Sequence, residues 1–174
     1  MTEDQAQQTI DQIRVNIAFE KLVFSVLTGA AIGGGLTLLL DLAGMVLGGL
    51  SFGALLAALL NTLLASFLIF LIGFFASVAI GAPLFVWLEK NKRRNVWPYL
   101  AAACAVAIAS FVVSAGGLPQ TSDFTLKTLV QIFIPAIFIA VMFARLMVPV
   151  WRAAEKAEAQ AAERDRPSNI IRLH

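Results

Sequence analysis

Long stretches with almost no charge dominate this chain. They cover Leu22–Leu40, Leu42–Leu88 and Val96–Val150, with a polar break at Pro119–Asp123 inside the last. A transmembrane helix needs about 20 apolar residues to cross a hydrocarbon core of about 30 Å. The 174 residues are 59% hydrophobic and 14% charged, whereas soluble domains are about 25% charged. These features predict an all-α, polytopic membrane protein.

The apolar stretches divide into four spans, which we expect to form a four-helix transmembrane bundle over residues 22–150. Four glycines between the first two spans predict a hinge, loop or re-entrant turn at residues 42–53, with Ser51 as the next N-cap. Pro83 disfavours helical geometry at Ala82 and predicts that residues 84–89 turn along the interface. Gly116-Gly117 suits a helix stop. The expected spans are about 22–40, 54–82, 97–117 and 126–150.

Two polar segments flank the bundle. In residues 1–21, Ile10, Ile13 and Ile17 recur at helical spacing and predict an amphipathic helix, which lies on the membrane surface or docks onto a partner. Acidic residues in this segment argue against a cleaved signal peptide, so we expect the first span to be retained. Residues 151–174 are rich in Ala, Glu, Lys and Arg, which predicts a cytoplasmic helix that ends at Pro167.

The positive charges decide the number of spans and their direction. With four spans, only Lys127 lies on the outer side, whereas five spans with a turn at Asn61-Thr62 would split the basic clusters. The positive-inside rule therefore favours four spans with both termini cytoplasmic, as in a bacterial inner membrane. The twelve Lys and Arg on the inner side are Arg14, Lys21, Lys90, Lys92, Arg93, Arg94, Arg145, Arg152, Lys156, Arg164, Arg166 and Arg172.

Small residues spaced four apart mark three helix faces. Such faces allow close helix packing, either inside the bundle or against another subunit. They comprise Gly29 and Gly33, then Gly73, Ser77 and Gly81, and finally Ala101, Ala105 and Ala109. Near the inner end of the fourth span, Arg145 can extend its charge toward the interface, and Glu89 is its candidate partner.

Polar side chains are more frequent in the outer half of the expected spans. Pro135 also frees the carbonyl of Gln131 from its helical hydrogen bond. We expect a shallow polar crevice that opens to the outer side, and the alternative is ordinary hydrogen bonding between helices. The candidate crevice residues are Thr37, Asp41, Asn61, Ser110, Ser114 and Gln131.

Several classes of function lack the residues they require. The only histidine is the last residue, His174, and the only cysteine, Cys104, lies in an apolar helix. These counts exclude histidine-based catalysis, a zinc centre and a thiol redox pair. The run at residues 90–94 is interpreted as a topology determinant beside a span, not as a nucleic-acid site. We therefore expect no enzyme activity, no catalytic residue, no metal and no cofactor.

The expected role is a non-enzymatic accessory or assembly subunit of an inner-membrane complex. Its partners would be the lipid bilayer and other membrane subunits, or further copies of itself. A small oligomeric transporter or channel that uses the polar crevice is the alternative, and a holin-type pore former is a third.

Overall fold

The structure, a computed structural model, describes residues 3–49, 51–115 and 125–164. Within these ranges, four helices are long and apolar enough to cross a membrane. They are Gln12–Gly48, Phe52–Lys90, Trp97–Ser114 and Leu126–Glu163. Everything between them in the described residues is a turn or short connection. Within the described residues, the expectation of an all-α chain with four helices long and apolar enough to span a membrane is confirmed.

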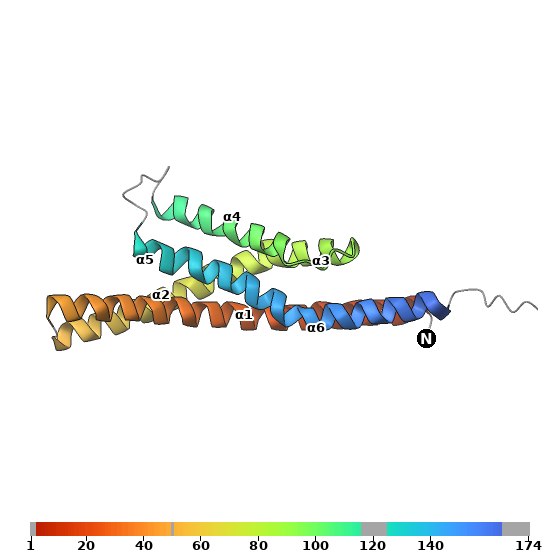
Figure 1. Ribbon diagram of the computed structural model, residues 1–174, viewed down its shortest axis with the longest axis horizontal. Helices are drawn as coiled ribbons and strands as arrows, with labels where there is room; N and C mark the ends of the chain where they lie inside the picture. Colours follow the sequence, from red (N-terminus) through yellow and green to blue (C-terminus); the bar gives the residue numbers. More distant parts are fainter. Residues whose placement is uncertain (1–2, 50, 116–124, 165–174) are drawn as a thin grey trace, which may run out of the picture.

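Helix α1 (Glu3–Gly48) is a single 46-residue helix. The segment that was expected to lie along the membrane surface instead continues the axis of the first span, as the long red-to-orange helix in Figure 1 shows. No proline or glycine lies between Glu3 and Thr28, so nothing in the sequence bends the helix there. The first span is therefore extended at both ends relative to residues 22–40.

The connection after α1 is shorter than the predicted hinge over residues 42–53. Gly44 and Gly48 remain helical, and the chain turns at Gly49, whose φ of 102° favours glycine. Helix α2 (Phe52–Ala76) then begins with Ser51 as its N-cap, whose side chain accepts a hydrogen bond from the Ala54 amide at 3.1 Å. The predicted N-cap is confirmed.

Two prolines are accommodated by π-helical turns. The π-turn η1 (Ser77–Gly81) follows α2, and the amide of Ala82 donates to the carbonyl of Ser77, five residues back. Helix α3 (Ala82–Lys90) continues directly, so the expectation that Pro83 ends the second span is wrong. A proline ring clashes with the preceding turn of a regular α-helix, and the wider π-turn relieves that clash.

The fourth span contains a second π-turn, whereas the third is a regular α-helix. Helix α4 (Trp97–Ser114) is followed by α5 (Leu126–Thr128), the π-turn η3 (Leu129–Phe133) and α6 (Ile134–Arg164). In η3, the amide of Ile134 donates to the carbonyl of Leu129, and Pro135 comes next. The predicted helical extension after the fourth span is present as far as Arg164, while the predicted stops at Gly116-Gly117 and Pro167 lie outside the described residues.

The spans form a bundle built on α1 and α6, which run antiparallel side by side (Figure 1). Helix α2 packs mainly on α1, and α4 packs mainly on α6. We call the end with residues 90–96, the start of α1 and the end of α6 the base. The other end, with residues 48–52 and the start of α5, is the tip.

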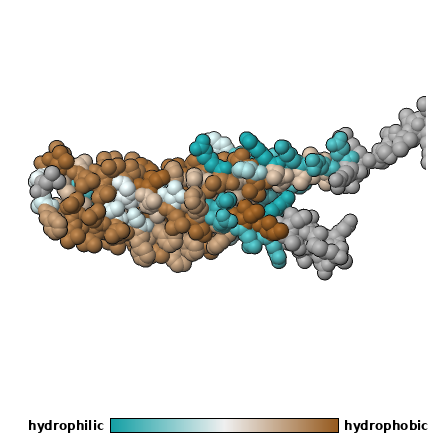
Figure 2. Space-filling model, turned by 90° about the horizontal axis from the view of Figure 1, so that it is seen from below, coloured by the Kyte–Doolittle hydropathy of each residue, from teal (hydrophilic) through white to brown (hydrophobic). Residues whose placement is uncertain are grey.

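Surface hydropathy follows the same axis. Figure 2 shows hydrophobic surface over most of the length from the tip, with hydrophilic residues gathered around the base. Large apolar side chains such as Leu47, Phe52 and Leu63 are more than 60% exposed. Exposed apolar surface of this extent suits lipid contact and is too large for a water-soluble monomer.

Glycines on α1 allow the closest helix approaches in the bundle. A Cβ on Gly33 would lie 2.6 Å from Cδ1 of Ile69 and 2.7 Å from Cγ of Pro135. A Cβ on Gly29 would meet the Ile139 side chain, whereas a Cβ on Gly35 would meet no atom within 4 Å. The predicted small-residue face of α1 is therefore used for packing inside the chain.

These contacts predict that Gly33→Ala lowers stability by about 1–3 kcal/mol, because the added methyl overpacks the contact with the rigid Pro135 ring. Gly35→Ala is the matched control and should leave stability unchanged or slightly raised, because glycine is the poorer helix former. Thermal unfolding of both variants in one detergent measures the difference. Equal midpoints for Gly33→Ala and the wild type would refute the packing role.

Candidate functional site

A cavity of about 380 Å³ lies between α2, α4 and the segment η3–α6. Helix α2 contributes one wall from Asn61 to Gly73, and α4 contributes the other with Val106, Ala107 and Ser110. The floor is formed by residues of α5, η3 and α6, including Gln131 and Pro135. Three of the six predicted crevice residues, Asn61, Ser110 and Gln131, line this cavity together with Lys127.

Two further predicted residues lie directly behind the lining. The Asn61 amide donates a hydrogen bond of 2.6 Å to the Asp41 carboxylate. The Gln131 amide lies 3.5 Å from the hydroxyl of Thr37, which is fully buried and donates to the carbonyl of Gly33 at 2.8 Å. These bonds link α1 to α2 and to η3, so they orient the polar side chains of the cavity.

Ser114 is the predicted crevice residue that does not join this group. It is exposed at the end of α4, and its hydroxyl bonds to the Phe111 carbonyl one turn earlier. In an apolar setting, such a bond satisfies a serine hydroxyl within its own helix.

Toward the base, the cavity becomes narrow and apolar. A second cavity of about 90 Å³ shares Gly73, Val106, Ala136 and Ile139 with the first and reaches Tyr99 and Phe143. Because the two cavities share these four residues, they form one tapering groove between α2–α3 and α4, with its polar groups concentrated near the tip. Helices α2 and α4 diverge toward the tip and are joined at the base through α3, as Figure 1 shows.

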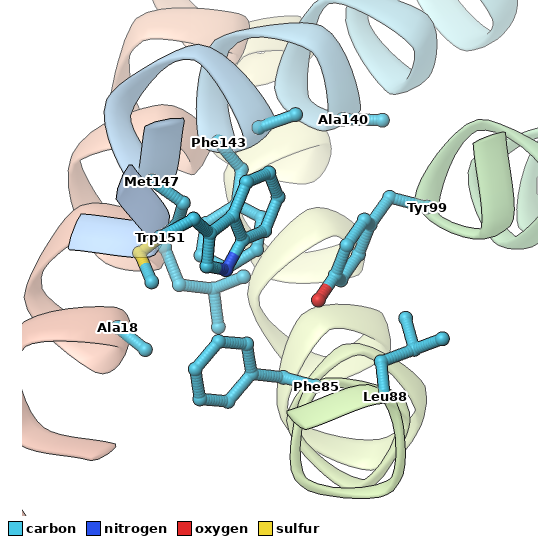
Figure 3. Packing of buried hydrophobic residues seen from close by; sticks show 10 residues of the cluster. Ala18, Phe85, Leu88, Tyr99, Ala140, Phe143, Met147 and Trp151 are labelled. Atoms are coloured by element: carbon cyan, nitrogen blue, oxygen red, sulfur yellow. The ribbon is translucent and has the colours of Figure 1, made fainter. Parts of the chain in front are cut away.

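An aromatic cluster lies at the base end of the groove, where Tyr99 and Phe143 contribute to the lining. Figure 3 shows how these rings pack. The ring of Tyr99 contacts Phe143 edge-on at 5.3 Å between centroids and stacks on Trp151 at 6.2 Å. Phe85 of α3 also contacts Phe143 edge-on, at 6.3 Å between centroids. Such pairs each contribute about 0.5–1.5 kcal/mol beyond their buried area. The cluster therefore joins α3, α4 and α6 into one packed layer, with Ala18 and Leu22 of α1 at its edge.

A charge cluster lies next to this layer. The Arg94 guanidinium has only 6% of its side chain exposed and pairs with Glu158 at 2.7 Å and Glu89 at 3.5 Å. Burial alone would lower the pKa of Arg94, but the hydrogen bond to Glu158 and the charge of Glu89 outweigh it and raise that pKa. Lys92 reaches Glu158 at 3.5 Å. The cluster connects the end of α3 and the 91–96 loop to α6.

The loop that carries Arg94 begins with a Schellman motif. The amide of Lys92 donates to the Glu89 carbonyl at 3.0 Å, and that of Arg93 donates to the Leu88 carbonyl at 2.9 Å. Lys92 has φ 53°, a left-handed position that glycine usually occupies. No glycine therefore marks this helix end in the sequence, and the expectation of a turn at 84–89 missed it by several residues.

The two residues predicted as an inner-interface pair are not brought together. Arg145 is exposed on α6 and makes no hydrogen bond or ion pair with any residue in the described part of the chain. Glu89 contacts Arg94 instead. Sequence reasoning missed the roles of Arg94 and Glu158 because they lie 64 residues apart, and no local spacing relates them.

The three small-residue faces have different surroundings. Gly73 faces α1 and α6, since a Cβ there would lie 3.3 Å from Val26 and 3.2 Å from Ile139, and Gly81 lies near Leu22. Ser77 lies half-buried between them. In contrast, Ala101, Ala105 and Ala109 are all exposed on the side of α4 that faces away from the groove. Cys104 is exposed on the same side.

The groove offers hydrogen-bonding groups at one end and an apolar packing surface along the rest of its length. Among residues 12–49, 51–115 and 125–163, no group of three or more His, Cys, Asp or Glu side chains could hold a metal ion. The polar side chains that line the cavity near the tip are two amides, one hydroxyl and one ammonium. Comparison of the chain with protein-family models, with curated proteins and with solved structures found no match.

The charge cluster predicts that Arg94→Met destabilises the contact between the 91–96 loop and α6 by about 1–3 kcal/mol. The substitution removes the charge-assisted hydrogen bonds and leaves the carboxylates of Glu89 and Glu158 without the Arg94 guanidinium. Hydrogen exchange of α6 beyond Trp151 should accelerate. Arg93→Met is the matched control, since Arg93 is exposed and has no ion pair among the described residues. Identical exchange in the two variants would contradict a docking role for Arg94.

Proposed function

We propose that this chain is a non-enzymatic, multi-pass membrane subunit that associates with a second membrane protein, or with another copy of itself, through α4. The observation that carries the proposal is the exposed face of Ala101, Ala105 and Ala109. In lipid, helices associate by close packing rather than by the hydrophobic effect, and small residues let their backbones approach. The comparable glycine face of α1 is already covered by α2 and α6.

The shape of the chain is consistent with a subunit role. Only 17% of the apolar window of α4 is buried within the chain, and only 11% of that of α2. Helices α1 and α6 also extend past α3 and α4 at the base, where they offer polar helical surface for contacts outside the bilayer (Figures 1 and 2).

The same proposal places the base in the cytoplasm and the chain in a bacterial-type inner membrane. Lys90, Lys92, Arg93 and Arg94 share the base with Arg152 and Lys156, and the positive-inside rule assigns such an end to the cytoplasm. A cysteine introduced at Asn91 should then react with an impermeant maleimide only in opened cells, and labelling in intact cells would reverse the orientation.

Transport through the groove is the second candidate, and the cavity lined by Asn61 and Gln131 is the observation that favours it. A conduction path would have to cross the whole bundle. The groove narrows to apolar residues and ends at the ring cluster of Tyr99, Phe143 and Trp151. This closed base favours the association proposal over a pore through one copy.

Association through α4 predicts that gentle solubilisation yields a complex heavier than the 18.7 kDa chain. Ala105→Leu should weaken that complex about tenfold, a loss of about 1.4 kcal/mol, because the larger side chain holds the backbones apart. Ala31→Leu makes the same change on an exposed position of α1 and should have no effect. Native mass spectrometry measures the complex in each variant.

The single cysteine distinguishes the two kinds of partner. If α4 contacts α4 of a second copy, mild oxidation in native membranes should produce a Cys104–Cys104 dimer that Cys104→Ala abolishes. A complex without this dimer indicates a different protein as the partner. If native mass spectrometry and oxidation both detect only a monomer, the association proposal is contradicted.

A further inference from the structure

The groove between α2 and α4 has one polar end and one apolar end. At the tip, Asn61, Ser110, Lys127 and Gln131 gather on its walls and floor. Further along, the lining is aliphatic, with Leu64, Leu68, Ile72, Val106 and Ile139. Its volume of about 380 Å³ falls within the range of small-molecule sites. This distribution matches an amphiphile with a polar head at the tip.

The charge of the polar end selects the head group. Lys127 is exposed and forms no ion pair in the described part of the chain. Asp41, the carboxylate behind the lining, accepts a hydrogen bond from Asn61. The lining at this end therefore carries one ammonium, of Lys127, and one hydroxyl, of Ser110. The amides of Asn61 and Gln131 beside them already donate to Asp41 and Thr37. A cation with a hydroxyl donor in the same lining suits a phosphate group.

The wide part of the groove, which is the cavity of about 380 Å³, is about as long as one leaflet of a bilayer is thick. Its α2 wall runs from Asn61 to Gly73, and at about 1.5 Å per residue this distance is about 18 Å. Half of a hydrocarbon core of about 30 Å is about 15 Å. An acyl chain that starts beside Lys127 would reach the narrow region near Gly73 at the middle of the bilayer.

We propose that this groove binds a phospholipid of the tip-side leaflet, with its phosphate at Lys127 and an acyl chain along Leu64, Leu68 and Val106. The bound lipid fills the wedge that the divergence of α2 and α4 leaves open. This inference goes beyond the association through α4, because Val106 and Ser110 lie on the opposite side of that helix from Ala101 and Ala105.

Native mass spectrometry of the full chain in detergent tests the proposal by titration with phosphatidylglycerol and, separately, with diacylglycerol of the same acyl chains, which lacks the phosphate. Phosphatidylglycerol should bind about tenfold more tightly, and Lys127→Gln should remove most of that preference. Lys156→Gln, an exposed lysine on the base side of α6, is the matched control.

A second pair of variants tests the acyl-chain position. Val106→Phe places a ring inside the groove and should abolish binding of both lipids, whereas Val113→Phe, at a position on α4 that is 80% exposed and outside the groove, should not. If the wild type binds both lipids equally and Lys127→Gln changes neither affinity, the assignment of the phosphate to Lys127 would be overturned. Binding that survives Val106→Phe would place the lipid elsewhere, and no binding by the wild type would overturn the proposal. None of these outcomes depends on whether the chain forms a complex.

Discussion

The contact between the glycine face of α1 and the proline-containing start of α6 is the interaction on which the rest of the bundle depends. Gly33 leaves room for the Pro135 ring and Ile69, and Gly29 leaves room for Ile139. In lipid, this close packing substitutes for the hydrophobic effect that would join helices in water. Because α1 and α6 fit so closely, α2 and α4 are attached along two separate helices and not mainly to each other.

Because α2 and α4 are separated, the chain has both the groove between them and the exposed alanine face on the outer side of α4. The inner sides of these helices bound the groove. Its polar end is fixed by the hydrogen bonds that Asn61 and Gln131 donate to Asp41 and Thr37 of α1. The outer side of α4 retains its alanine face because no other part of the described chain covers it. At the base, the ring cluster and Arg94 hold α3 and α4 against α6, so the groove can widen only toward the tip.

The sequence predicted features that depend on composition and depth, and it missed those that depend on tertiary contacts. Apolar length was sufficient to predict four helices that are long and apolar enough to span a membrane. The depth of Asn61, Ser110 and Gln131 in the second, third and fourth of these helices was sufficient to place them in one region. Pro83 was misinterpreted as a helix end. The π-turn that precedes it makes room for the proline ring, so the helix continues. Lys92 in a glycine-like conformation, and Arg94 paired across 64 residues, leave no local pattern to find.

Helix α4 is held at the base and diverges from α2 toward the tip (Figure 1). Spin labels on cysteines, with Cys104→Ala as background, measure this divergence by pulsed electron paramagnetic resonance in bilayers. One pair at Leu60 and Val113 reports on the tip, and another at Val86 and Trp97 reports on the base, all four positions being exposed. The structure predicts a longer distance for the tip pair. A tip distance equal to or shorter than the base distance would contradict it.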